Sequence, residues 1–392
     1  MNKSKAIRQR QLKLAFPIFF LSYYFSEVVS GWPLLRHMGL RGGRNFEDFY
    51  VILVTARCKP GSFYPGTNQL CIFPYGSSLR WFLKIIPIPL AHWNAIGWLL
   101  IVTIGLLLLL IITIGQEVNV YSLVFYIVIF SSPPIILLLE RGNFDAVMVC
   151  LVCLAGYSFG KEKVFTGILL IFITTLFKFY TLPLLFLPIF LVKKISVKIA
   201  SGFAIVASLL TIYFDRSVIF SHTHIGAFAA FGTPVYGSYL KKIDHKIQLN
   251  YSTEHIFGLA CFVVGLLLAI FFVKRSWLAI PRTTSTSIEG RIDTRNWIYL
   301  LTAGATISCF ITSNNYDYRL IYFLIASIVY LQIRQISRKE KYIFALLVVG
   351  VAWMNYDVWS LQPFGNTALF ILLIFMILDI YRTFFNFRKF QI

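Results

Sequence analysis

The chain has 392 residues, of which 58% are hydrophobic, 17% aromatic and only 13% charged. This balance excludes an ordinary soluble protein. The net charge of +20 does not indicate nucleic-acid binding, because the lysines and arginines stand in short segments beside apolar runs, where they set membrane orientation.

Long segments without Asp, Glu, Lys or Arg follow one another along the chain. They include Ile85–Gln116, Val118–Leu139, His255–Val273, Asn296–Tyr316 and Val358–Leu378. Each can cross a hydrocarbon core of about 30 Å as a helix, and a backbone in lipid must satisfy its own hydrogen bonds. The sequence therefore predicts an all-α polytopic transmembrane helical bundle of about 11–13 helices. We expect one integral membrane domain over residues 1–392, with no soluble domain.

Basic clusters between the apolar runs predict the orientation. Five basic residues precede the first apolar run, Leu14–Ser26, and no small-x-small cleavage site follows it, which favours a signal anchor with a cytoplasmic N-terminus. Later clusters at 161–163, 193–198, 274–295, 334–341 and 382–389 also belong in the cytoplasm by this rule. The outer face of a cell (inner) membrane then receives long loops at about 31–78 and 215–254.

Two segments are too short for ordinary spans. Val164–Phe177 and Phe179–Val192 have 14 residues each and are separated by Lys178, which predicts a hairpin that turns near Lys178 on the outer side. Leu79–Leu90, which contains Pro87 and Pro89, is predicted to be a re-entrant or interfacial helix.

The first outer loop carries the candidate general base. Glu47 and Asp48 lie in an aromatic setting, Arg44-Asn45-Phe46-Glu47-Asp48-Phe49-Tyr50. A carboxylate here can take a proton from a sugar hydroxyl held within hydrogen-bond reach. The alternative is a solvated carboxylate paired with Arg44.

Three basic residues stand at predicted outer turns. Arg141, Lys178 and Arg319 each lie between apolar helices, and together they could hold a phosphate at headgroup depth and stabilise it as a leaving group. The alternative for each one is snorkelling, in which a long side chain near a helix end lifts its charge to the interface.

Cysteine and motif content add little. Cys58 and Cys71 share the first outer loop and can form a disulfide if that loop faces an oxidising compartment, whereas Cys150 and Cys153 are expected to be packing residues. The absence of a Walker loop and of a metal-ligand Cys/His cluster in the sequence argues against nucleotide hydrolysis.

Five short motifs together resemble glycosyltransferase family 87, a family of C-type membrane glycosyltransferases. They are the outer-loop Asp48, Phe73-Pro74-Tyr75-Gly76, Glu140-Arg141-Gly142-Asn143-Phe144-Asp145, Lys178-Phe179-Tyr180-Thr181-Leu182-Pro183 and Asn315-Tyr316-Asp317-Tyr318-Arg319-Leu320. The resemblance covers residues 46–331 in the family's order. It implies an inverting hexose transfer, with mannose the expected sugar, from a polyprenyl-phosphate donor.

The resemblance also implies roles for individual residues. Asp48 matches the general base, with Glu47 as the fallback, and Tyr75 matches the aromatic residue of the first loop's closing motif. The positions that match the donor and phosphate site are Arg141, Asn143, Lys178, Tyr180, Asp317 and Arg319. The sequence departs from the family where Thr181 and Leu182 precede Pro183, and where Phe-Pro-Tyr-Gly replaces Tyr-Pro-Pro, so it leaves the donor sugar and the acceptor open.

The expected partners are therefore a polyprenyl-phosphate sugar donor, a lipid-linked or glycan acceptor and membrane lipids, without nucleic acid or cofactor. A transporter or flippase of lipid-linked saccharides is the alternative, but it would place titratable residues along helix interiors and show two related halves. A polysaccharide polymerase is a further alternative, supported by Lys241, Lys242 and Lys246 in the second outer loop.

Overall fold

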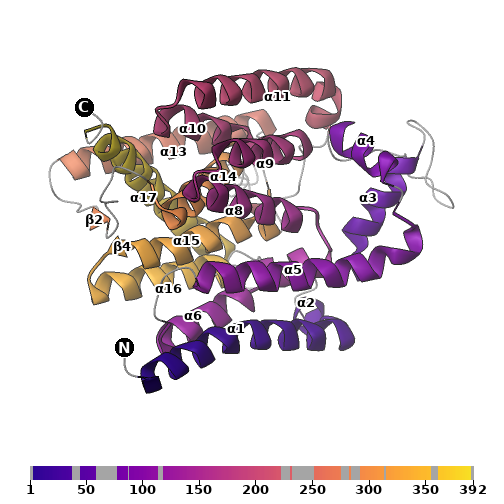
Figure 1. The fold of residues 1–392 in the computed structure, drawn as a ribbon, viewed down its shortest axis with the longest axis horizontal. Helices are drawn as coiled ribbons and strands as arrows, with labels where there is room; N and C mark the ends of the chain where they lie inside the picture. The colour runs from indigo at the N-terminus through magenta and orange to yellow at the C-terminus, as the bar shows by residue number, and fades with distance from the viewer. Residues whose placement is uncertain are drawn as a thin grey trace, which may run out of the picture. The chain divides into compact units, whose positions relative to one another are not determined.

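A computed structural model describes residues 3–37, 45–58, 77–86, 88–113, 118–221, 230–231, 251–274, 282–283, 292–312, 315–354 and 361–389. Its first elements are α1 (Lys3–Val29), α2 (Pro33–His37), α3 (Glu47–Arg57), α4 (Ser77–Ile85), η1 (Leu90–His92), α5 (Trp93–Thr113), α6 (Val120–Phe130), α7 (Pro133–Glu140), α8 (Asp145–Gly160) and α9 (Val164–Phe177) (Figure 1). They are followed by η2 (Phe179–Leu185), α10 (Phe186–Leu191), α11 (Ile195–Ser221), β1 (Ala230–Phe231), α13 (Tyr251–Lys274), β2 (Arg282–Thr283) and α14 (Thr294–Thr312). The last elements are β3 (Asn315–Tyr316), η3 (Asp317–Leu320), α15 (Ile321–Ile333), β4 (Arg334–Gln335), α16 (Arg338–Met354) and α17 (Gln362–Lys389).

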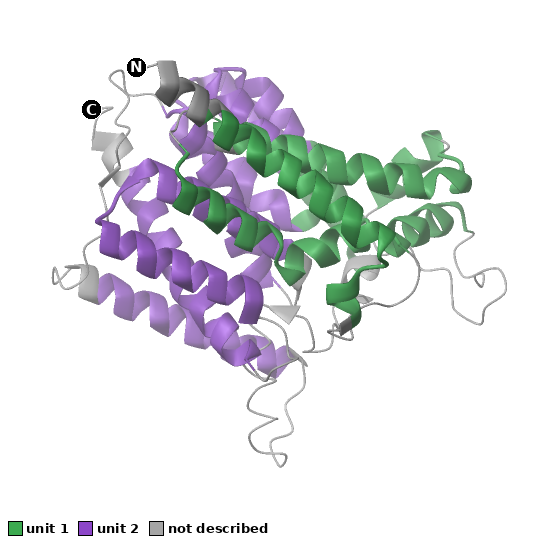
Figure 2. Ribbon diagram, turned by 90° about the horizontal axis from the view of Figure 1, so that it is seen from below, with its two compact units in different colours: residues 1–151, 173–179, 206–222 green, residues 152–172, 180–205, 223–392 purple. Residues whose placement is uncertain are grey.

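The contacts of the chain group into two compact units (Figure 2). Unit 1 contains residues 1–151, 173–179 and 206–222, and unit 2 contains residues 152–172, 180–205 and 223–392. Each unit is helical, with strands limited to the two-residue antiparallel pairs β1–β3 and β2–β4 of unit 2 in the part of the chain that is described.

Several helices have the length and apolar composition of membrane spans. Among the described residues these are the segments Gln11–Val29, Leu90–Ile111, Ile195–Arg216, Ser252–Phe271 and Gln362–Phe384, with α6 and α7 as a sixth if that bent pair counts as one. Shorter apolar helices of 10–17 residues accompany them, α8, α9 and α15 among them. The protein is thus an all-α, multi-pass membrane protein, and the 11–13 crossings expected from the sequence exceed the spans that length and composition identify.

The predicted span Val118–Leu139 is broken. Its two parts, α6 and α7, meet at an angle of 52°. Asn119 caps the start of α6 by accepting a hydrogen bond of 2.8 Å from the Ser122 N–H. Pro133 and Pro134 occupy the first turn of α7, where a missing N–H costs no helical hydrogen bond. The Ser-Ser-Pro-Pro sequence therefore ends one helix and starts another.

The predicted interfacial segment forms α4, which is tied to two neighbours within unit 1. The Arg80 guanidinium donates to the Ala56 and Cys58 carbonyl oxygens at the end of α3. The Asp215 carboxylate, near the end of α11, accepts from the N–H and the hydroxyl of Ser77 at 2.8 and 3.0 Å. Trp81 and Ile85 stay exposed, and an exposed apolar face of this kind in a membrane protein is suited to lipid.

The described cysteines differ in their bonding. Cys58 is disulfide-bonded, and Cys71, the partner proposed from the sequence, lies outside the described residues. Cys150 and Cys153 are buried thiols in α8, which fits a packing role.

The predicted break at Lys178 is present. Helix α9 ends at Phe177, the Lys178 N–H donates to the Thr174 carbonyl oxygen at 2.7 Å, and the 3-10 helix η2 follows. The break gives Lys178 a position at a helix end, from which its side chain reaches other parts of unit 1.

Two glycines let helices of unit 2 approach closely. A Cβ at Gly156 of α8 would lie 2.9 Å from the backbone of Ile298 on α14, and one at Gly160 would lie 2.2 Å from the Thr294 hydroxyl oxygen. Small residues four apart are a usual way for membrane helices to pack. The residues 156–160 thus form a Gly-x-x-x-Gly contact with α14.

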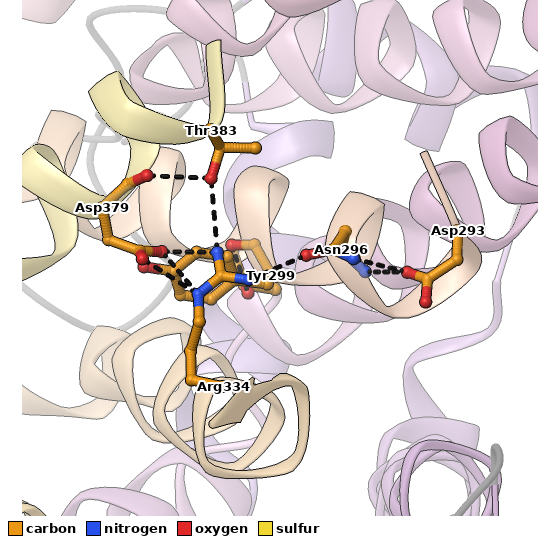
Figure 3. Close-up of polar contacts among 7 residues, drawn as sticks. Asp293, Asn296, Tyr299, Arg334, Asp379 and Thr383 are labelled. Carbon is orange, nitrogen blue, oxygen red and sulfur yellow. Dashed lines mark hydrogen bonds and ion pairs between the residues drawn. The ribbon is translucent and has the colours of Figure 1, made fainter. Parts of the chain in front are cut away.

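A buried arginine joins three elements of unit 2 (Figure 3). The Arg334 guanidinium donates to Asp379 through Nε at 2.9 Å and Nη2 at 2.5 Å, and through Nη1 to Asn296 Oδ1 at 3.1 Å. Asn296 in turn donates from its side-chain nitrogen to Asp293 at 2.9 Å. Arg334 is 1% exposed, so it is a buried structural cation and not the solvated loop charge that the basic cluster 334–341 suggested.

Candidate functional site

Backbone hydrogen bonds join the two segments that carry the candidate base and the candidate arginine. The N–H groups of Phe46 and Asp48 donate to the carbonyl oxygens of Glu140 and Arg141 at 2.5 and 2.9 Å. The first turn of a helix has N–H groups without helical partners, and the last turn has such carbonyl groups. The start of α3 therefore docks on the end of α7, which brings Asp48 beside Arg141.

The residue before the acidic pair has an unusual backbone. Phe46 is buried in the left-handed region with φ of 58°, which costs about 1–3 kcal/mol for a residue other than glycine. Two glycines make room for it. A Cβ at Gly97 would lie 2.2 Å from the Phe46 ring, and one at Gly142, itself at φ of 57°, would lie 2.9 Å from the Phe46 Cβ. This packing fixes the entry into α3.

The Asp48 carboxylate is held from two sides. Its Oδ2 accepts a hydrogen bond of 2.8 Å from the Asn143 side-chain nitrogen, and its Oδ1 lies 3.6 Å from Arg141 Nη1. Asn143 cannot be turned over, because its Oδ1 accepts from the Asp145 N–H at 2.9 Å. The Asp48 side chain is still 27% exposed, so a substrate hydroxyl can reach it.

Burial raises the pKa of Asp48 above its ordinary value. The Asn143 hydrogen bond and the charges of Arg141 and Lys178 act against this rise, and the Glu47 carboxylate adds to it. A carboxylate with a raised pKa is a better proton acceptor near neutral pH, provided that its ionised form is still populated.

Arg141 lies among three carboxylates. Its Nη1 is 3.6 Å from Glu47 and 3.6 Å from Asp48, and its Nε is 3.5 Å from the buried Glu140. These distances exceed the usual range for charge-assisted hydrogen bonds. The guanidinium is therefore attracted to all three acids without being closely bound to any of these oxygens.

Lys178 extends the cluster. Its ammonium lies 3.2 Å from Asp145 Oδ2, and both side chains are buried. Phe177 packs against Phe82 and Phe144, with ring centroids 5.4 and 5.8 Å apart, beside this pair. Asn143 donates a hydrogen bond to Asp48 and accepts one from the Asp145 N–H, so two residues connect the candidate base to the lysine.

Two acids of this cluster, Glu140 and Asp145, were assigned no role from the sequence, although they stand in the quoted motif. Both flank the Arg-Gly-Asn turn, and their signal was available: an acid at the edge of an apolar run is buried only with a compensating cation. With Glu47 and Asp48, the cluster has four carboxyl groups against two cations. The expected surplus of positive charge for a phosphate is thus not present among these residues of unit 1.

Tyr180 and Arg319 form a second group, in unit 2. The Arg319 guanidinium lies 5.1 Å from the centre of the Tyr180 ring, and the Tyr180 and Tyr322 hydroxyl oxygens are 3.2 Å apart. Strand β3, just before Arg319, pairs with β1, with Ala230 opposite Tyr316. Arg319 is thus held by an aromatic face and follows a paired backbone.

The remaining predicted residues are not placed in either group. Tyr75 lies outside the described residues, and Asp317 is described only as part of η3. In the described part of the chain, no group of three or more His, Cys, Asp and Glu side chains is arranged to hold a metal ion. Comparison of the chain with protein-family models, with curated proteins and with solved structures finds no match.

Proposed function

We propose that this protein is a membrane glycosyltransferase. It transfers a hexose, with mannose the first choice, from a polyprenyl-phosphate donor to a lipid-linked or glycan acceptor at the outer face of a cell membrane. The observation that carries the proposal is the setting of Asp48: partly exposed, oriented by Asn143 and raised in pKa, within a cluster that also contains Arg141 and Lys178.

In the proposed reaction, Asp48 removes the proton of the acceptor hydroxyl as its oxygen attacks the anomeric carbon. The anomeric carbon–oxygen bond to the phosphate breaks on the opposite face, and its electron pair stays with the phosphate. Arg141 and Lys178 stabilise the charge of the departing phosphate. Attack from the opposite face gives inversion.

The pairing of the cations is compatible with this role. A phosphate oxygen at about 2.8 Å would hold the Arg141 guanidinium more closely than any of its three carboxylate contacts at 3.5–3.6 Å does. The acids keep the cation in position until a phosphate competes for it. The disulfide at Cys58 supports an outer, oxidising location for this region, with the N-terminus in the cytoplasm.

Purified protein in liposomes, supplied with labelled polyprenyl-phosphate mannose and candidate acceptors, tests the proposal. The wild type should form a labelled product, and Asp48→Asn should lose at least about 100-fold in rate, the usual contribution of a general base. Gly202→Ala, at a position with open space around its Cβ, is the control and should keep wild-type turnover.

Glu47→Gln separates the two candidate bases. A complete loss of transfer in Glu47→Gln with retained transfer in Asp48→Asn would move the role to Glu47. Retained transfer in both variants would exclude the mechanism.

The same liposomes test a transporter. Asp379 is buried, pairs with Arg334 and stands in a helix long enough to span a membrane, so it is the type of residue expected on a transport route. Movement of the labelled lipid across the bilayer without a new product would favour transport over transfer.

A further inference from the structure

Asp145 is placed to act on two candidate site residues at once. It is the first residue of α8, its side chain is fully buried, and its carboxylate lies 3.2 Å from the Lys178 ammonium. Its backbone N–H orients the Asn143 side chain that holds Asp48.

A buried ammonium keeps its proton only when charge is supplied to replace water. Lys178 is buried, and burial alone favours the neutral amine. The carboxylate of Asp145 opposes that effect, because an opposite charge at this distance favours the ionised form. Other charged groups stand close by: Glu47, Asp48 and Glu140 lie 3.5–3.6 Å from Arg141, and the charge of Lys178 also acts on Asp48.

We propose that Asp145 is a positioning residue that keeps Lys178 charged and in place for the donor phosphate. This inference rests on the proposed function, because it assigns Lys178 to a phosphate. Without the Asp145 carboxylate, Lys178 gives up its proton at a lower pH, and the site then loses phosphate affinity at a pH where the wild type still binds.

Binding of farnesyl phosphate to the purified full-length protein in nanodiscs, measured from pH 8 to pH 10, tests this role. The phosphate keeps one charge state across this range, so a change in affinity reports on the protein. In Asp145→Asn, the loss of affinity at alkaline pH should begin about one pH unit lower than in the wild type. At one alkaline pH, this shift corresponds to binding about tenfold weaker than that of the wild type. A purely structural role would lower affinity equally at every pH.

A second variant shows whether the lysine is the titrating group. In Asp145→Asn combined with Lys178→Arg, the guanidinium stays charged throughout the range, so the shift should disappear. Asp215→Asn is the matched control: it removes another nearly buried acid of unit 1, one that holds Ser77 and not the site, and its pH profile should equal that of the wild type. If Asp145→Asn does not fold, Asp145→Ser keeps a short polar residue at the start of α8 and should give the same shift.

Three results would overturn the inference. An Asp145→Asn profile parallel to that of the wild type would show that the acid does not hold the lysine's charge, while leaving the proposed function intact. A shift that persists in the Lys178→Arg background would assign the titration to another group. A wild type that does not bind farnesyl phosphate at any pH would remove both this inference and the proposed function.

Discussion

The side-chain nitrogen of Asn143 donates a 2.8 Å hydrogen bond to the Asp48 carboxylate across 95 residues of sequence. This bond favours the ionised form of the acid and lowers its pKa, against the larger effect of burial. Asn143 therefore offsets part of the rise in the pKa of Asp48 that burial causes.

Replacing Asn143 by Ala should move the acid limb of the pH–rate profile to higher pH. The bond that lowers the pKa of Asp48 is lost, so the carboxylate ionises later. A bond worth about 1 kcal/mol corresponds to about 0.7 pH unit. The measurement is kcat/KM for sugar transfer against pH. The control Asn119→Ala, which removes a helix cap of α6, should leave the acid limb of the pH–rate profile at its wild-type pH. An acid limb at the wild-type pH in Asn143→Ala would contradict the role given to Asn143.

Asp48→Asn should unfold at a temperature no lower than that of the wild type, although we expect it to lose transfer activity. The folded-state pKa of Asp48 is raised, so the group contributes stability when protonated and loses it as the pH rises through that pKa. At neutral pH the ionised group is a net cost, which the neutral amide avoids. Thermal unfolding in detergent at pH 5 and pH 8 checks this, with the gain expected at pH 8. A lower melting temperature of the variant at pH 8 would mean that the carboxylate is a structural ion-pair partner.

Gly142→Ala should destabilise unit 1 and displace Asp48. The new Cβ would lie 2.9 Å from the Phe46 Cβ, at a backbone position with φ of 57°. The expected loss is about 1–3 kcal/mol of unfolding free energy, read from thermal or denaturant unfolding. Gly202→Ala has open space and should gain about 0.5–1 kcal/mol from the better helix propensity, so equal behaviour of the two variants would refute the packing argument.

The Arg334–Asp379 pair should show strong coupling. Either Arg334→Leu or Asp379→Leu alone leaves a buried charge without its partner in this pair, at a cost of about 3–5 kcal/mol. The double variant should cost less than either single one, because no buried charge remains. The unfolding free energies of the wild type, the two single variants and the double variant form a double-mutant cycle that gives the coupling energy. Additive losses would mean that the two side chains act independently.

Sequence patterns predicted the helices and their interruption at Lys178 because both depend on local composition. Charge-free runs of about 20 residues have few alternatives to helices in lipid. The break of Val118–Leu139 was also present locally, in Ser131-Ser132-Pro133-Pro134, and the sequence reading missed it by counting charges alone.

The ion pairs between residues far apart in the sequence could not be predicted from local sequence patterns. Arg334 was taken for a loop charge, and its partner Asp379 stands 45 residues later in a long apolar helix. In the same way, Lys178 was expected to bind a phosphate, whereas in the structure its ammonium contacts the Asp145 carboxylate, 33 residues earlier. Which cation meets which acid depends on how helices pack, and periodicity contains no information on that choice.

The hydrogen bonds of Arg80 join α4 to the end of α3. Helix α3 is about 16 Å long. Asp48 stands in its first turn, and a carbonyl oxygen in its last turn accepts a hydrogen bond from Arg80 of α4, the helix on which Trp81 is exposed. Under the proposed function, a force that the bilayer exerts on α4 would reach the candidate base Asp48 through α3. The rate of sugar transfer by the wild-type protein should therefore differ between detergent micelles and bilayers, and between bilayers whose lipids have acyl chains of different length.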